Sequence, residues 1–181
     1  MEQPNILRTA YSAEQLQSRV RELGEAISAD YAGQELVLVA VLRGALYFFA
    51  DLTRAISGSI QTDCIAFGMY AHSHTGVVRI TKDLDVDITG KHVLIVEDIV
   101  RTGLTLGYLV QNIETRSPAS VKVCALFVNP AQQLISVPIA YQGFTVSSGW
   151  LMGYGMDVNE HWRHLPYVVE VEKATGNHAA K

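Results

Sequence analysis

The sequence predicts an α/β domain with a mostly parallel central sheet flanked by helices. Three continuous apolar, β-branched runs are typical of strands covered on both faces, and they lie at residues 35–42, 91–99 and 121–128. Helical patterns alternate with these runs, as in β-α-β units. Ligands of such sheets bind beyond the carboxyl ends of the strands, so we expect the loops after Leu42, Asp98 and Val128 along one rim. The chain has 181 residues, and we expect residues 1–181 to form a single domain.

The individual elements follow from local signals. Ser12 to Gln15 has the pattern of a capping box, and residues 13–29 then carry apolar side chains at helical spacing. Arg43-Gly44-Ala45 ends the first buried strand. The other expected helices span residues 46–57 and 104–115. The other expected strands span residues 61–70, 77–81 and 139–145, with a polar loop tip at 72–76. The last residues, 174–181, are expected to fray.

Composition and charge exclude several classes of protein. The net charge is −4, and the 14 Lys and Arg residues are scattered, which argues against nucleic-acid and anionic-membrane partners. The first residues lack a signal-peptide pattern, and the longest apolar run, residues 36–42, is too short to span a bilayer. Cys64 and Cys124 lie in separate apolar segments, which indicates reduced thiols. We therefore expect a cytoplasmic protein.

The segment from Val93 to Leu106 gives the first indication of function. Residues 102–105, Thr-Gly-Leu-Thr, follow a strand and open a helix, where backbone N–H groups and the helix dipole favour an anion. An ordinary capped turn explains this pattern equally well. Glu97 and Asp98 favour the phosphate interpretation, because paired acids beside a phosphate fit the hydroxyls of a sugar or a divalent cation. Together the two features indicate a sugar phosphate.

The same segment resembles the phosphoribosyl-diphosphate (PRPP) motif of the purine phosphoribosyltransferases, specifically the hypoxanthine-guanine group. The resemblance extends from about Leu36 to Tyr167, and four further segments carry it: VLRGALYFFADL, GVVRITKDLDVDITGKHVLIVED, VKVCALFVNP and GWLMGYGMDVNEHWRHLPYV. It implies the type I phosphoribosyltransferase fold with a small hood, Mg²⁺ as cofactor, and PRPP and a purine-like base as substrates. We also expect a homodimer or homotetramer.

The resemblance implies a role for each matching position. The PRPP site would comprise Leu42, Arg43 and Gly44 in a loop with a cis peptide, Glu97 and Asp98 at the ribose, Thr102, Gly103, Leu104 and Thr105 at the 5-phosphate, and Arg163 at the pyrophosphate. The base site would comprise Ile99, Arg101, Asn129, Trp150, Leu151 and Asp157. The expected catalytic residues are Glu97, Asp98 and Arg101. The acids linked to Mg²⁺ would be Asp157, Glu97 and Asp98. A mobile loop over residues 70–78 would exclude water, and its His72 and His74 are expected to be solvated.

Three positions depart from the family pattern. Arg101 replaces an aspartate that faces N7 of the purine, Asn129 replaces a lysine that reads the 6-oxo group, and Met69-Tyr70 replaces a Ser-Tyr pair in a shortened loop. A guanidinium cannot accept a proton, but it pairs well with a carboxylate. We therefore expect a base with a carboxylate at position 7, such as the 7-carboxy-7-deazaguanine of deazapurine-nucleoside pathways. Two alternatives stay open: ordinary hypoxanthine and guanine salvage, with Arg101 paired to Glu97 or Asp98 or in solvent, and a non-catalytic PRPP- or nucleotide-binding regulator.

Overall fold

A six-stranded sheet forms the centre of the computed structural model, which describes residues 4–69, 78–147 and 149–172. Its strand order is β4-β3-β2-β5-β6-β7. The strands are β2 (Leu36–Leu42), β3 (Ile60–Met69), β4 (Val78–Lys82), β5 (His92–Val100), β6 (Ser120–Val128) and β7 (Ile139–Thr145). All neighbours pair in parallel except β3 and β4, which are antiparallel. The predicted mostly parallel sheet is confirmed.

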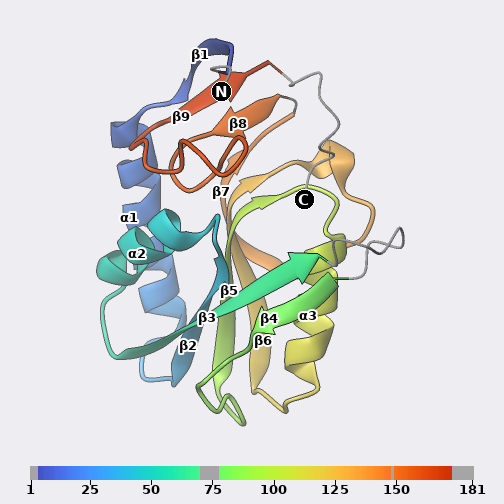
Figure 1. Ribbon diagram of the computed structural model, residues 1–181. Coiled ribbons are helices and arrows are strands. Elements are labelled where there is room, and N and C mark those ends of the chain that lie inside the picture. The colour runs from blue at the N-terminus through green and yellow to red at the C-terminus, as the bar shows by residue number, and fades with distance from the viewer. Residues whose placement is uncertain (1–3, 70–77, 148, 173–181) are drawn as a thin grey trace.

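Helices cover both faces of this sheet (Figure 1). Helices α1 (Ala13–Asp30) and α2 (Leu46–Ala55) lie on one face, and α3 (Leu104–Glu114) lies on the other. A short 3₁₀ turn, η1, spans Pro130–Gln132. The capping box at the start of α1 is present: Ser12 Oγ accepts from the Gln15 N–H, and Gln15 Oε1 accepts from the Ser12 N–H at 2.8 Å. Helix α2 ends two residues before the predicted limit, because Ile56 is already extended.

Successive side chains of the central strands belong alternately to two hydrophobic clusters, one on each face of the sheet. Leu36 and Leu38 of β2 pack with α1 and α2, whereas Val37 and Val39 of the same strand pack with α3. Successive side chains of a strand point to opposite faces, so a strand covered on both faces must be apolar throughout. This requirement explains why the central strands read as continuous apolar runs.

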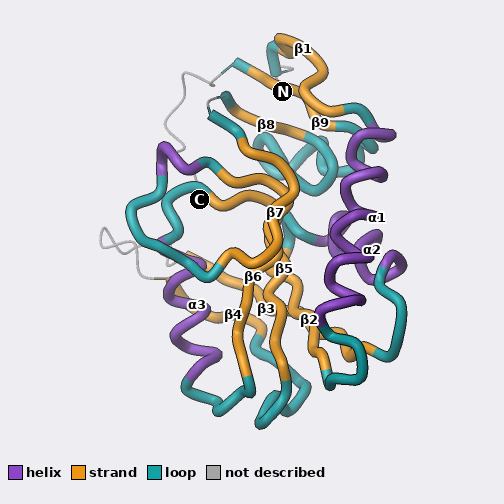
Figure 2. The backbone as a smooth tube through the Cα atoms, turned by 180° about the vertical axis from the view of Figure 1, so that it is seen from behind, coloured by secondary structure: helices purple, strands orange, loops and turns teal. Residues whose placement is uncertain are grey.

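A second, three-stranded antiparallel sheet lies above the carboxyl ends of the central strands, and we call it the hood (Figures 1 and 2). It has the order β1-β9-β8, with β1 at Ile6–Tyr11, β8 at Trp150–Met152 and β9 at Val168–Val171. The resemblance implied a hood, but sequence patterns predicted none of its strands. These strands are short, and β1 pairs with β9 across most of the chain, so no local periodicity marks them.

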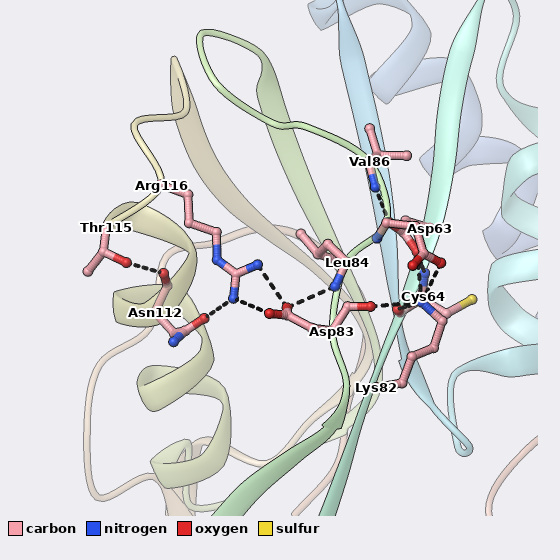
Figure 3. Close-up of polar contacts among 10 residues, drawn as sticks. Asp63, Cys64, Lys82, Asp83, Leu84, Val86, Asn112, Thr115 and Arg116 are labelled. Atoms are coloured by element: carbon pink, nitrogen blue, oxygen red, sulfur yellow. Dashed lines mark hydrogen bonds and ion pairs between the residues drawn. The ribbon is translucent and has the colours of Figure 1, made fainter.

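The segment between β4 and β5 is fixed by a polar network (Figure 3). The buried carboxylate of Asp63 on β3 accepts hydrogen bonds from the backbone N–H groups of Cys64, Asp85 and Val86, at 2.7, 2.7 and 2.9 Å. Lys82 Nζ lies 3.2 Å from the same carboxylate. Burial alone would raise the pKa of Asp63, but these hydrogen bonds outweigh burial and lower it.

The predicted loop tip and nearly all of the predicted mobile loop, including His72 and His74, fall in residues 70–77 and lie outside the described residues. The predicted frayed end, residues 174–181, also lies outside them. None of the described helices combines the length and the apolar character that crossing a bilayer requires.

Candidate active site

The predicted rim is present at the carboxyl ends of three adjacent strands. β2 pairs with β5, and β5 pairs with β6, both in parallel, so the loops after these strands open at the same edge. The Asn129 N–H donates to the Val100 carbonyl at 2.9 Å and joins the ends of β6 and β5. The hood covers this edge, which places hood residues opposite the loops of the main sheet.

The loop after β2 is held between Asp98 and the turn at residues 153–156, which follows β8 and which we call the hood turn. The Leu42–Arg43 peptide bond is cis, as the family resemblance implied. The Cα of Gly44 faces Asp98 so closely that a Cβ there would lie 2.5 Å from the carboxyl carbon. On the hood side, a Cβ on Gly155 would lie 3.1 Å from the Gly44 carbonyl carbon and would overlap its oxygen. Both approaches require glycine, so the loop, Asp98 and the hood form one site.

Glu97 and Asp98 lie near the carboxyl end of β5, with Asp98 two residues before its last residue Val100, and both are half-buried. Asp98 Oδ1 accepts from the Ile99 N–H at 2.7 Å, and Glu97 Oε1 accepts from the Asp98 N–H at 3.2 Å. Burial first, and then the charge of Asp98, raise the pKa of Glu97 well above the usual carboxyl range. The free protein therefore keeps a proton on this pair to a higher pH than an ordinary carboxyl would.

The start of α3 offers the predicted anion-binding geometry. Gly103 is the N-cap residue with a φ of 78°, a left-handed conformation that favours glycine. A Cβ at this position would also lie 2.9 Å from the Ile135 carbonyl oxygen. Thr102, Leu104 and Thr105 are exposed around the helix start, where the first N–H groups have no partner within the helix. The loop thus presents backbone donors and two hydroxyl groups on its surface.

Arg101 lies in contact with the hood. Its guanidinium carbon is 4.8 Å from the centroid of the Trp150 ring, at the start of β8. The side chain is half-buried, and burial lowers the pKa of the guanidinium, while the negative charge of Asp98 opposes that shift. Arg101 therefore stacks on the aromatic ring assigned to the base site, and it does not extend freely into solvent. The structure brings together the two side chains that would meet the base.

Asn129 is the most unusual polar residue at this rim. It is only 4% exposed, and its Oδ1 has no hydrogen-bond partner within the described part of the chain. A buried acceptor without a donor costs about 1–3 kcal/mol, so such an atom commonly marks a ligand contact. Ile99 and Leu151 pack into the core on the α1 and α2 side. Their side chains are therefore part of the scaffold, and any contact of Leu151 with a base would have to use its backbone groups.

A chain of ion pairs crosses from the loop after β2 to the segment after the hood turn. Arg43 is 2.7 Å from Glu160, Glu160 is 2.8 Å from Arg163, and Arg163 is 2.7 Å from Asp157. Arg163 also donates to the Gly155 carbonyl at 2.7 Å. The family resemblance identified Arg43, Arg163 and Asp157 but did not include Glu160. Its only signal is a spacing of three residues from both Asp157 and Arg163.

The described residues contain no group of three or more His, Cys, Asp or Glu side chains suited to hold a metal by themselves. Mg²⁺ does not require such a group, because it binds through one or two carboxylates, water and substrate phosphates. Glu97 with Asp98, and Asp157 at the other side of the loop, supply carboxylates of this kind. The residues present therefore fit a magnesium ion that arrives with a phosphorylated substrate.

Comparison with known proteins adds to this geometry. Residues 11–159 match the family described as "Phosphoribosyl transferase domain". A hypoxanthine-guanine phosphoribosyltransferase of Mycobacterium tuberculosis is 46% identical over 172 residues, which cover 91% of this chain and 85% of that protein. This chain belongs to the hypoxanthine-guanine phosphoribosyltransferase family. A hypoxanthine phosphoribosyltransferase of Escherichia coli is 39% identical over 161 residues, which cover 87% of this chain and 90% of that protein.

The fold agrees with that membership. The crystal structure of a hypoxanthine-guanine phosphoribosyltransferase from Bacillus anthracis, with a HEPES molecule in its active site, superposes with a TM-score of 0.88 at 39% identity. The match covers 93% of this chain and 100% of that one. The predicted type I phosphoribosyltransferase fold is confirmed. Members of this family are enzymes, so this chain is an enzyme, and the interpretation as a non-catalytic regulator is not supported.

Proposed function

We propose that this enzyme transfers the 5-phosphoribosyl group of PRPP to a 6-oxopurine, hypoxanthine or guanine, and releases pyrophosphate. The names of its relatives support this reaction over the carboxylated deazapurine that Arg101 predicts from the sequence. The observation that carries the proposal is the close approach of the Asp98 carboxylate to Gly44. It joins the acids that would bind ribose to the loop that would bind the leaving group.

Each part of the site has a physical role in this reaction. Cleavage of the bond between ribose and pyrophosphate develops positive charge on the sugar and negative charge on the leaving group. Glu97 and Asp98 would stabilise the sugar, and Arg43 and Arg163 would neutralise the pyrophosphate. The N-terminus of α3, with Thr102 to Thr105, would hold the 5-phosphate. A purine nitrogen then attacks the anomeric carbon, and the hood limits access of water.

Magnesium is part of the proposal. Asp157, and Glu97 with Asp98, are the carboxylates that would hold it beside the diphosphate of PRPP. When bound, the ion would neutralise developing charge on the leaving group. We also propose a single domain over residues 1–181, a cytoplasmic location, and a homodimer or homotetramer. These three points rest on the sequence and on the family resemblance, and not on the geometry of the site.

A second substrate is favoured by one observation, the contact of Arg101 with Trp150. A base stacked on Trp150 would either contact the Arg101 guanidinium with the edge of the base or displace the guanidinium from the Trp150 ring. A base with a carboxylate at position 7, such as 7-carboxy-7-deazaguanine, would pair with Arg101 in that place. Hypoxanthine and guanine would instead present N7–H to a donor. Asn129, with its unpartnered Oδ1, would meet the 6-position of either base.

Pyrophosphate release from PRPP tests these candidates directly. We expect turnover with hypoxanthine and guanine, measured as kcat/KM, and no turnover when PRPP is omitted. The Arg101→Asp variant should raise kcat/KM for guanine, because it restores an acceptor at N7. Arg21→Asp, at an exposed position of α1, applies the same charge reversal far from the site and serves as the control.

Three other results would change the conclusion. Turnover of 7-carboxy-7-deazaguanine alone, lost in Arg101→Asp, would make the carboxylated base the substrate. Absence of pyrophosphate release with every base would refute phosphoribosyl transfer altogether. An Arg101→Asp variant identical to wild type with all bases would mean that Arg101 does not contact the substrate.

A further inference from the structure

A single carboxylate oxygen joins the two arginines assigned to the leaving group. Glu160 Oε2 lies 2.7 Å from an Arg43 guanidinium nitrogen and 2.8 Å from an Arg163 guanidinium nitrogen. The two arginines come from opposite sides of the site, the loop after β2 and the segment that follows the hood turn. An anionic oxygen bound between two guanidinium groups is the arrangement that a phosphate oxygen would adopt in the same place.

The backbone around Glu160 is shaped to present this oxygen. Asn159, Glu160 and Trp162 have φ values of 52°, 65° and 73°, which are uncommon for residues other than glycine. The Glu160 N–H donates to Asp157 Oδ2 at 2.7 Å, and Val158 and His161 form an isolated antiparallel bridge. Clusters of such residues are found where a surrounding structure holds a functional side chain in place.

The two arginines differ in how firmly they are held. Besides Glu160, Arg163 contacts Asp157 and the Gly155 carbonyl, and neither of these contacts depends on Glu160. The Arg43 side chain is 64% exposed, and among the described residues its ion-pair partner is Glu160. When no other anion is bound, Glu160 therefore holds the Arg43 side chain next to Arg163.

We propose that Glu160 is a positioning residue that occupies the place of a pyrophosphate oxygen in the free enzyme and is displaced when PRPP binds. This inference rests on the proposed function, which assigns Arg43 and Arg163 to the leaving group. Glu160 prevents the two cations from repelling each other and keeps them at the spacing of a bridging anion. Because it must leave before the diphosphate can bind, it also weakens the affinity for PRPP and for pyrophosphate.

The direction of the effect separates this role from a structural one. Glu160→Gln keeps the shape of the side chain and removes its charge, so both arginines become available to the diphosphate. We expect the KM for PRPP and the inhibition constant of inorganic pyrophosphate to fall together, about three- to tenfold, as expected for two ion pairs that are partly exposed to solvent. The kcat should not rise, because pyrophosphate then leaves more slowly. A residue that only stabilises the loop would give the opposite change in KM.

A matched control is Glu22→Gln. Glu22 makes an equally short ion pair with Arg19 on α1, at 2.6 Å, and is similarly exposed, so it tests loss of one carboxylate outside the site. This control should leave both constants unchanged. Glu160→Asp keeps the charge on a shorter side chain and should return the KM for PRPP towards the wild-type value. Thermal melting of each variant checks that it is folded.

The outcomes distinguish this inference from the proposed function. A Glu160→Gln enzyme with an unchanged or higher KM for PRPP, beside an active wild type, would overturn the role of Glu160 and leave phosphoribosyl transfer intact. A wild type that binds neither PRPP nor inorganic pyrophosphate in calorimetric titration would overturn both. Tighter binding of both anions by Glu160→Gln, with wild-type values in Glu22→Gln, is the expected result.

Discussion

Replacement of Gly44 by alanine is expected to inactivate the enzyme without unfolding it. The φ of Gly44 lies outside the left-handed region, so the backbone accepts an L residue and the perturbation is purely steric. The new Cβ would lie 2.5 Å from the Asp98 carboxyl carbon and 3.0 Å from its Oδ1. Carbon atoms in contact are normally about 3.5–4.0 Å apart, so the carboxylate or the loop must move by about 1 Å.

The cost for folding and the cost for catalysis differ. Asp98 is a side chain at the rim and can rotate away at the expense of its 2.7 Å hydrogen bond from the Ile99 N–H, which contributes about 0.5–1.5 kcal/mol. A displacement of about 1 Å in a group that positions the substrate can lower the rate about 100-fold. We therefore expect kcat/KM for PRPP to fall about 100-fold, with only a small change in the free energy of unfolding.

Gly24→Ala provides the matched control. A Cβ on Gly24 would lie 2.6 Å from the Ala55 carbonyl oxygen, where α1 packs on α2. Backbone cannot rotate away, so this change should destabilise the fold by about 1–3 kcal/mol and lower Tm by about 2–4 °C per kcal/mol. Its kcat/KM should stay at the wild-type value. A Gly44→Ala enzyme that kept wild-type kcat/KM would refute the assignment of Asp98 and the loop after β2 to one site.

Three further outcomes are expected. Glu97→Gln should raise Tm more at pH 8 than at pH 5, because the raised pKa of Glu97 makes the wild type lose stability as pH rises above the usual carboxyl range. The affinity of the same variant for PRPP, measured by calorimetry, should fall. Asp63→Asn should lose about 1.5–3 kcal/mol in urea unfolding at pH 7, and since the pKa of Asp63 is lowered in the fold, this loss should shrink towards acid pH. Chelation of Mg²⁺ should abolish pyrophosphate release, and undiminished turnover would remove the metal from the mechanism.

Local patterns in the sequence determined the main sheet, its helices and the position of the rim. The central strands could be predicted because both of their faces are covered, so every side chain in them must be apolar. The start of α1 could be predicted because a capping box satisfies backbone groups within three residues. Glu97 and Asp98 stood out because two acids directly follow a buried apolar run, where charge is otherwise excluded.

Only the tertiary structure decided the hood and the contacts that complete the site. Arg8 and Glu170 pair across 162 residues of sequence, and no periodic pattern within β1 or β9 indicates their partner. A side chain at Gly44 would meet Asp98, a side chain at Gly155 would meet the Gly44 carbonyl group, and these three residues meet only after the sheet and the hood have formed. Glu160 reads as an ordinary surface acid in the sequence. It becomes the shared partner of Arg43 and Arg163 because the hood turn packs against the loop after β2 and brings the two arginines to the same oxygen. No local preference of the sequence encodes this long-range arrangement.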